Sequence, residues 1–205
     1  MKRVIYKLTV FILMISLLVP SLVGCAKEDD ATLLTVAQEL LEKSNAVNRI
    51  CFGEGLTKSE DGYKLSGYSE VTAEDREKYR LATVEDIRAL VREVYSVAAC
   101  DYIDSVVFSP VQTESGYVSY RRYFDATEND IIHLMVKNEY EPLTTGDVTY
   151  ENVRVASHKK SRAEILVDIT VTDGSETRTD KDVMLSLRKE GGAWRFDTVT
   201  YSSIK

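Results

Sequence analysis

An alternating run in the C-terminal half of the chain is the feature that most constrains its fold. On an extended chain from position 164 to 171, one face carries only β-branched apolar residues, Ile165, Val167, Ile169 and Val171. The opposite face carries Glu164, Asp168 and Thr170. Successive side chains of a β-strand point to opposite faces of the sheet. The run is therefore typical of an antiparallel sheet that is covered on one side only.

Further runs with a period of two follow Pro110 and are separated by turn residues. Together they predict six strands: Tyr117–Phe124, Ile131–Asn138, Val148–Ala156, Arg162–Val171, Asp182–Arg188 and Trp194–Tyr201. Thr172-Asp173-Gly174 and Gly191-Gly192 supply the turns of two predicted hairpins.

Two amphipathic helices are predicted before these strands. Apolar residues recur at helical spacing over 33–50, and a second apolar stripe covers 84–98. Thr83 and Asp86 are spaced as a capping box at the start of the second helix. Residues 58–80, which lie between the helices, are interpreted as a strand or loop excursion. Helices followed by strands predict the α+β class, with both helices packed on an antiparallel sheet of about five to six strands.

The N-terminus resembles the signal segment of bacterial lipoproteins. Three basic residues precede an apolar stretch over 8–19, and Leu22-Val23-Gly24-Cys25 resembles a lipobox. In that family a diacylglyceryl group is attached to the cysteine before cleavage. The resemblance implies removal of residues 1–24, lipid on Cys25, a tether over 25–31 and one domain over 32–205. It places that domain at the extracytoplasmic face of the cell membrane.

An uncleaved transmembrane anchor is the alternative for this segment. A membrane span needs about 20 consecutive apolar residues. The apolar run here is shorter, and Pro20 interrupts it. The pattern favours cleavage.

The charge of the chain excludes one class of partner. The net charge is −7, and it becomes −10 when Lys2, Arg3 and Lys7 are removed with the signal segment. Binding to nucleic-acid phosphates depends on clustered lysine and arginine. We therefore expect no nucleic-acid partner. An anionic membrane surface would repel a body of this charge, so we expect membrane contact only through the lipid on Cys25.

Cys51 and Cys100 remain once Cys25 carries lipid. An even number of cysteines outside the reducing cytosol is compatible with one disulfide. The alternative is that both thiols are small buried hydrophobes, and the sequence leaves both open. The two cysteines and two histidines are too few and too widely spaced for a structural zinc site. We expect neither a metal nor a cofactor.

Candidate catalytic residues are few. His133 lies in an apolar strand, on the face of Ile131 and Met135, where a histidine is more typical of a core or cavity wall than of a general base. His158 is interpreted as a turn residue. Neither accompanies a G-x-S-x-G sequence or a catalytic cysteine signature. We therefore expect no enzymatic activity.

Tyrosine and arginine gather in one predicted strand. Tyr120 and Tyr123 stand beside Arg121 and Arg122. Both residue types provide large contact areas with polar tips, and both are enriched at interface hot spots. Tyr120, Arg122 and Tyr123 are therefore our candidates for a partner-binding surface. The alternative is that the tyrosines pack the sheet.

The order of elements resembles the cystatin-like and nuclear-transport-factor-two-like superfamily over residues 32–203. The terminal sequence Gly-Gly-Ala-Trp-Arg-Phe-Asp at 191–197 carries most of this resemblance. It implies that two helices pack on a curved antiparallel sheet, and it implies little about function, because this architecture hosts enzymes, pockets and docking modules. The helix that begins Thr83-Val84-Glu85-Asp86-Ile87 and the terminal hairpin also resemble those of Gram-positive secreted inhibitors of DL-endopeptidase autolysins.

These observations predict a lipid-anchored, non-enzymatic binding or regulatory protein of the bacterial cell envelope. The inhibitor resemblance implies an envelope protein as partner, such as a cell-wall hydrolase whose active site the domain would block. The alternative is a small ligand in a pocket between helix and sheet, with His133 and buried tyrosines as its polar groups.

Overall fold

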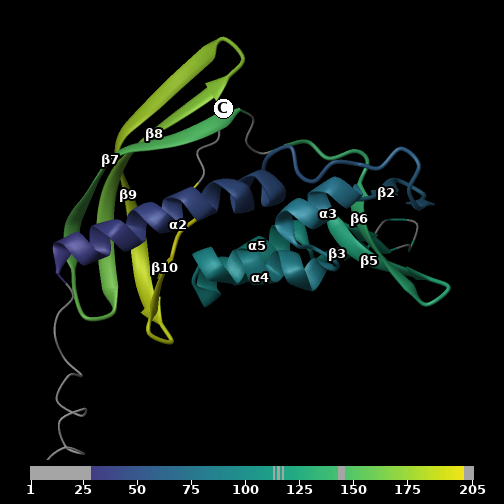
Figure 1. Cartoon of the computed structure of the whole chain (residues 1–205), viewed down its shortest axis with the longest axis horizontal. Coiled ribbons are helices and arrows are strands. Elements are labelled where there is room, and N and C mark those ends of the chain that lie inside the picture. Colours follow the sequence, from purple (N-terminus) through teal and green to yellow (C-terminus); the bar gives the residue numbers. More distant parts are fainter. Residues whose placement is uncertain (1–28, 113, 115, 117, 143–145, 201–205) are drawn as a thin grey trace, which may run out of the picture.

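This computed structural model describes residues 29–112, 114, 116, 118–142 and 146–200 (Figure 1). Its helices are α2 (Asp30–Cys51), α3 (Ala73–Tyr79), α4 (Val84–Val94) and α5 (Val97–Val107). Its strands are β1 (Lys64–Leu65), β2 (Tyr68–Glu70), β3 (Pro110–Gln112), β4 (Val118–Tyr120), β5 (Tyr123–Glu128), β6 (Ile131–Lys137), β7 (Asp147–His158), β8 (Arg162–Asp173), β9 (Glu176–Glu190) and β10 (Ala193–Phe196). The predicted signal segment and Cys25 lie outside the described residues, so their processing stays a prediction.

The strands form two sheets and a ribbon, and all their pairings are antiparallel. The large sheet has the order β10-β9-β8-β7, the small sheet has the order β1-β2-β6-β5, and β3 pairs with β4. The α+β class with antiparallel sheets is confirmed. The prediction of one sheet of five to six strands is wrong, because β2 pairs with β6 and so occupies the edge that β7 would need.

Helix α2 runs across the large sheet, and α4 and α5 lie beside it (Figure 1). Asp29 caps the start of α2 by accepting a hydrogen bond of 2.7 Å from the Thr32 N–H. One hydrophobic cluster joins buried residues of α2, α4 and α5 to residues of both four-stranded sheets. Among the described residues, no helix is both long and apolar enough to cross a membrane.

The second predicted helix is two helices in the structure. The capping box is present, with the Thr83 N–H donating to the Asp86 carboxylate at 2.8 Å. Helix α4 ends before Tyr95, which has extended backbone, and Ser96 then caps α5. The apolar stripe therefore does not continue through residue 98 in one helix. The break arises because the Ser96 N–H donates to the carbonyl of Phe196 in β10 at 2.8 Å instead of continuing α4.

Two other segments also differ from the prediction. Residues 58–80 hold β1 and β2, but they also hold α3, whose start is capped by the Thr72 hydroxyl. The predicted strand 117–124 is divided at Arg121-Arg122 into β4 and β5, and Tyr117 lies outside the described residues. The last strand ends at Phe196, whereas the prediction extended it to Tyr201.

A buried carboxylate holds a bend in the large sheet. Strands β7 and β9 each carry a register shift where they flank β8, and Asn152 and Asp182 adopt positive φ angles of 52° and 56° at these places. Asp168 of β8 accepts a 2.9 Å hydrogen bond from the Asp182 N–H and a 2.8 Å hydrogen bond from Asn152 Nδ2. One side chain thus joins both bulges.

We predict that Asp168→Ala lowers the free energy of unfolding by about 1–3 kcal/mol, because two polar groups lose their acceptor at a buried site. Urea denaturation of the variant and the parent checks this. The matched control is Glu151→Ala, an exposed residue paired opposite Asp168, which should change the free energy by less than about 0.5 kcal/mol. Equal effects of the two substitutions would contradict a role for Asp168 in the bend.

Candidate functional site

Arg122 and Tyr123, two of the predicted partner-binding residues, are buried. Arg122 is 1 % exposed, and its guanidinium donates to the carbonyls of Cys51 at 3.0 Å and Gly53 at 2.6 Å. Tyr123 is fully buried, and its hydroxyl donates to the carbonyl of Ile50 at 2.9 Å. Both side chains therefore hold the end of α2 and do not form an exposed surface.

Tyr120 and His133 lie elsewhere, around the aromatic side chains of the small sheet. Tyr120 stacks on Phe124 with 4.6 Å between the ring centroids. His133 stacks on Tyr63 at 4.6 Å, and its Nδ1 lies 3.2 Å from Glu70 Oε1. The four candidate binding residues are thus not brought together.

The two described cysteines are not bridged. Cys51 is fully buried and Cys100 is partly exposed, and both are free. The buried-hydrophobe alternative describes Cys51, and the disulfide is absent from this structure. Burial raises the pKa of the Cys51 thiol to about 12.

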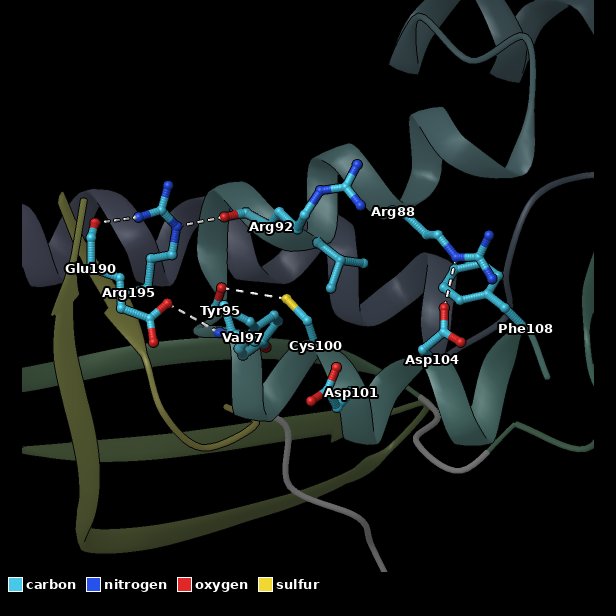
Figure 2. Close-up of a pocket in the computed structure, with 11 residues that line it drawn as sticks. Arg88, Arg92, Tyr95, Val97, Cys100, Asp101, Asp104, Phe108, Glu190 and Arg195 are labelled. Atoms are coloured by element: carbon cyan, nitrogen blue, oxygen red, sulfur yellow. Dashed lines mark hydrogen bonds and ion pairs between the residues drawn. The ribbon is translucent and has the colours of Figure 1, made fainter. Parts of the chain in front are cut away.

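Cys100 opens onto a pocket of about 420 Å³ between α4, α5 and the β9–β10 hairpin, which we call the α4–α5 pocket (Figure 2). From α4 and the residue after it come Arg88, Val91, Arg92 and Tyr95. From α5 and the residue after it come Val97, Cys100, Asp101, Asp104 and Phe108. The hairpin adds Glu190 and Arg195.

Helical spacing explains why these residues meet. On α5, residues at 97, 100, 101, 104 and 108 recur at intervals of three and four, so they share one face. Positions 88, 91, 92 and 95 do the same on the neighbouring helix. This site was not predicted from the sequence, because the predicted apolar stripe ended at residue 98 and no separate helix was expected over 97–107. The interval pattern of Cys100, Asp101 and Asp104 was the available signal.

The inner wall of the pocket is apolar. Val91, Tyr95 and Phe108 are at most 3 % exposed. The Tyr95 hydroxyl donates to Asn48 Oδ1 at 2.6 Å, inside the core, so its polar end is already satisfied. Burial raises the pKa of this phenol, which keeps it neutral.

Charged groups form the rest of the lining, and two of them, Arg88 and Asp104, are paired with each other. Arg88 Nε lies 2.6 Å from Asp104 Oδ1, and its guanidinium lies 5.0 Å from the Phe108 ring centroid. Arg92 pairs with Glu85. Arg195 differs, because its guanidinium donates to two backbone carbonyls, of Arg92 at 2.6 Å and of Glu190 at 3.1 Å.

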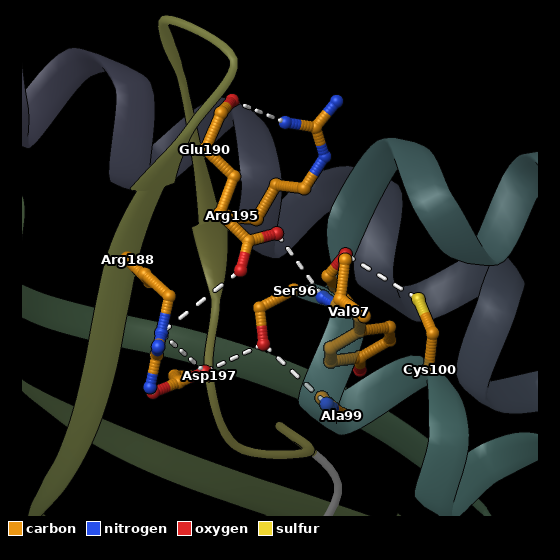
Figure 3. A network of polar contacts seen from close by, with 9 residues as sticks. Ser96, Val97, Ala99, Cys100, Arg188, Glu190, Arg195 and Asp197 are labelled. Atoms are coloured by element: carbon orange, nitrogen blue, oxygen red, sulfur yellow. Dashed lines mark hydrogen bonds and ion pairs between the residues drawn. The ribbon is translucent and has the colours of Figure 1, made fainter.

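A polar network fixes the hairpin to the start of α5 (Figure 3). Arg188 Nε and Nη2 donate to the Asp197 carboxylate at 3.0 and 2.7 Å, and the Ser96 hydroxyl donates to it at 2.6 Å. Glu190 accepts from the Val97 N–H at 3.1 Å. The pocket wall is therefore held at both sides of the Gly191-Gly192 turn.

The Cys100 thiol lies among several charges of the pocket. Burial raises its pKa, and Asp101 and Glu190 add to this, whereas the cations Arg92 and Arg195 oppose it. The thiol also contacts the carbonyl oxygen of Tyr95 at 3.4 Å. The raised pKa favours the protonated thiol, so Cys100 is not an activated nucleophile. Because Cys100 lines the pocket, a bound ligand would change the access of reagents to its thiol.

Neither histidine lines the α4–α5 pocket. His158, at the end of β7, has its Nε2 2.6 Å from Asp30 Oδ1 at the start of α2. Within the described part of the chain, no group of three or more His, Cys, Asp or Glu side chains is placed to hold a metal ion.

No protein-family model matches this chain, and no curated protein matches it.

We predict that iodoacetamide at pH 8 modifies Cys100 in the folded protein and leaves Cys51 unmodified, because only the first thiol reaches solvent. Peptide mapping by mass spectrometry identifies the modified residue. In denaturant both thiols should react. Modification of Cys51 at the rate of Cys100 under native conditions would contradict the burial of Cys51.

We predict a pH-dependent contribution from Asp197. The hydrogen bond from Arg188 lowers the pKa of its carboxyl group, and the neighbouring Ser96 hydroxyl lowers it further. The unfolded chain, with an ordinary Asp pKa of about 3.9, therefore binds a proton more readily than the folded protein. This stabilisation is complete above the unfolded pKa and is lost as the pH falls through the folded pKa.

The measurement compares the free energy of unfolding of the parent and of Asp197→Asn from pH 7 to pH 2. The difference should be largest at neutral pH and should shrink below about pH 4. Asp101→Asn, an exposed change on α5, is the control and should show a small difference throughout. A gap of constant size for Asp197→Asn would rule out this linkage.

Proposed function

We propose that this protein is a lipid-anchored, extracytoplasmic, non-enzymatic binding protein of the bacterial cell envelope, and that the α4–α5 pocket is its ligand site. The observation that carries the proposal is the pocket itself, which combines an apolar wall with a few fixed polar groups. Ligand sites in proteins commonly have this composition and occupy about 300–1,000 Å³. The lipid on Cys25 supplies the anchor in this proposal.

Binding is favoured over catalysis by how the pocket side chains are engaged. Arg88 and Asp104 are paired with each other, and Glu190 caps the first N–H of α5. A nucleophile beside a general base is the arrangement that acyl transfer needs. In the α4–α5 pocket the thiol of Cys100 has a raised pKa and no histidine beside it.

A small ligand is favoured over a docked protein by the positions of the predicted hot-spot residues. The side chains of Arg122 and Tyr123 donate to backbone carbonyls inside the protein. This supports the alternative that the aromatic and basic residues of the predicted strand 117–124 serve internal packing. Inhibition of a cell-wall hydrolase stays a prediction, and the buried Arg122 and Tyr123 do not supply a contact surface for it. The ligand pocket also differs from the expected one, because His133 is not among its lining residues.

Pocket filling tests this proposal. Cys100→Trp places an indole in the α4–α5 pocket, and Tyr102→Trp places the same side chain on the exposed face of α5, outside the lining. Native mass spectrometry of each protein, after incubation with a low-molecular-weight extract of bacterial envelope, records what stays bound. We expect a bound species with the parent and with Tyr102→Trp, and its loss with Cys100→Trp.

A second incubation uses the protein fraction of the same bacterial envelope in place of the low-molecular-weight extract. Absence of any small species bound to the parent would contradict the ligand-site proposal. Capture of a cell-wall hydrolase that is equal for the parent and for Cys100→Trp would replace it with protein docking at another surface.

A further inference from the structure

We infer that the ligand of the α4–α5 pocket carries a carboxylate, which Arg195 binds, and a compact apolar group, which the inner wall receives. This inference rests on the proposed function, since it names the chemistry of the ligand at that same site. Its main support is the guanidinium of Arg195, which is held in place and has no counterion among the described residues.

The position of the Arg195 guanidinium is fixed by the end of a helix. The Arg92 carbonyl belongs to the last turn of α4, where carbonyl groups lose their partners within the helix. The N–H that would have reached it, that of Ser96, donates to Phe196 instead. Arg195 Nε takes its place at 2.6 Å, and Nη1 donates to the Glu190 carbonyl at 3.1 Å (Figure 2).

Two carbonyl contacts orient the guanidinium without neutralising it. Among the residues that the structure describes, no carboxylate oxygen lies within ion-pair distance of Arg195, whereas Arg88 and Arg92 both have such partners. A guanidinium has five N–H donors in a planar fork. The carbonyls take one from Nε and one from Nη1, so the Nη2 amino group has no partner among the described residues and stays available to an acceptor.

The carboxylates of the pocket do not occupy that amino group. Glu190 accepts from the Val97 N–H at 3.1 Å and lies 4.0 Å from Arg188, so its carboxylate faces the start of α5. Asp104 is paired with Arg88. Asp101 is exposed, so water weakens its effect on the Arg195 guanidinium without cancelling it.

A carboxylate is the anion that best matches this arrangement. Arginine binds planar carboxylates through charge-assisted hydrogen bonds, and a half-buried position strengthens them because less water competes. Val91, Tyr95 and Phe108 then offer apolar surface to the remainder of the ligand. Such a ligand is either a free small acid or the C-terminal carboxylate of a peptide.

The test compares ligands of equal shape and different charge. The full chain, reconstituted in phosphatidylcholine nanodiscs, is titrated with N-acetyl-leucine and with N-acetyl-leucinamide, and empty nanodiscs provide the blank. We expect the acid to bind roughly tenfold or more tightly than the amide, as the loss of a charged hydrogen bond predicts. Hexanoate and the peptide acetyl-Gly-Leu, each with its amide, distinguish the two sources of the carboxylate.

Two variants locate the effect. Arg195→Gln should remove the preference for the acid, and thermal unfolding shows whether that variant remains folded. Asp101→Asn alters an exposed side chain and so keeps the test valid if Arg195→Gln does not fold. Because it removes a nearby negative charge, it should strengthen binding of the acid by roughly twofold or more and leave binding of the amide unchanged.

The outcomes separate the two proposals. Equal binding of acid and amide, abolished by Cys100→Trp, would overturn the carboxylate inference and retain the ligand site. A preference for the acid that persists in folded Arg195→Gln, or an equal gain for both ligands in Asp101→Asn, would overturn the role of Arg195. Failure of every probe to bind, or binding that Cys100→Trp does not change, would count against the pocket itself.

Discussion

The fold depends on one buried guanidinium. The Arg122 side chain reaches the carbonyl of Cys51, the last residue of α2, where the helix dipole favours a cation, and the carbonyl of Gly53 just beyond the helix. It also stacks on the Tyr140 ring, 3.8 Å from its centroid. Its backbone N–H donates to the Val107 carbonyl at the end of α5, and its own carbonyl accepts from Lys137 at the end of β6. Burying this charge is costly unless all these partners are present. The ends of α2, α5 and β6 must therefore meet together, and Gly55 is required beside them because a Cβ there would collide with Arg122.

The same logic of helix ends creates the α4–α5 pocket. When the Ser96 N–H turns to Phe196, α4 stops, α5 starts in a new direction, and the carbonyl of Arg92 is left without a partner in its own helix. Arg195 of β10 satisfies that carbonyl, which places its guanidinium at the end of α4 and in the lining of the pocket. The break in the helix, the pocket and its cation are consequences of one exchange of hydrogen bonds.

Local patterns in the sequence predicted those elements that local forces determine. The stripe of α2, the Thr83–Asp86 capping box and the alternation of β8 each depend on residues close in the chain, and each is present. The division of the strands into two sheets depends on the pairing of β2 with β6, whose paired residues are 65 to 69 positions apart in the chain. The burial of Arg122 likewise depends on α2, which precedes it by about seventy residues. The clustering of arginine and tyrosine in one predicted strand made Arg122 and Tyr123 candidates for a binding surface. It could not show that both side chains donate to backbone carbonyls at the end of a helix that is distant in the chain.

The contact between His158 and Asp30 has a mechanical meaning if Cys25 carries lipid. Helix α2 begins at Asp30, and its N-cap Asp29 is four peptide links from Cys25, a reach of at most about 14 Å. Because His158 Nε2 lies 2.6 Å from Asp30 Oδ1, the turn after β7 is held beside the start of α2, where the tether to Cys25 joins the domain. The opposite end of α2 is about 33 Å further along the helix axis. With lipid on Cys25, this corner would be the part of the domain nearest its attachment point, and the β7–β8 turn would lie within reach of the lipid headgroups.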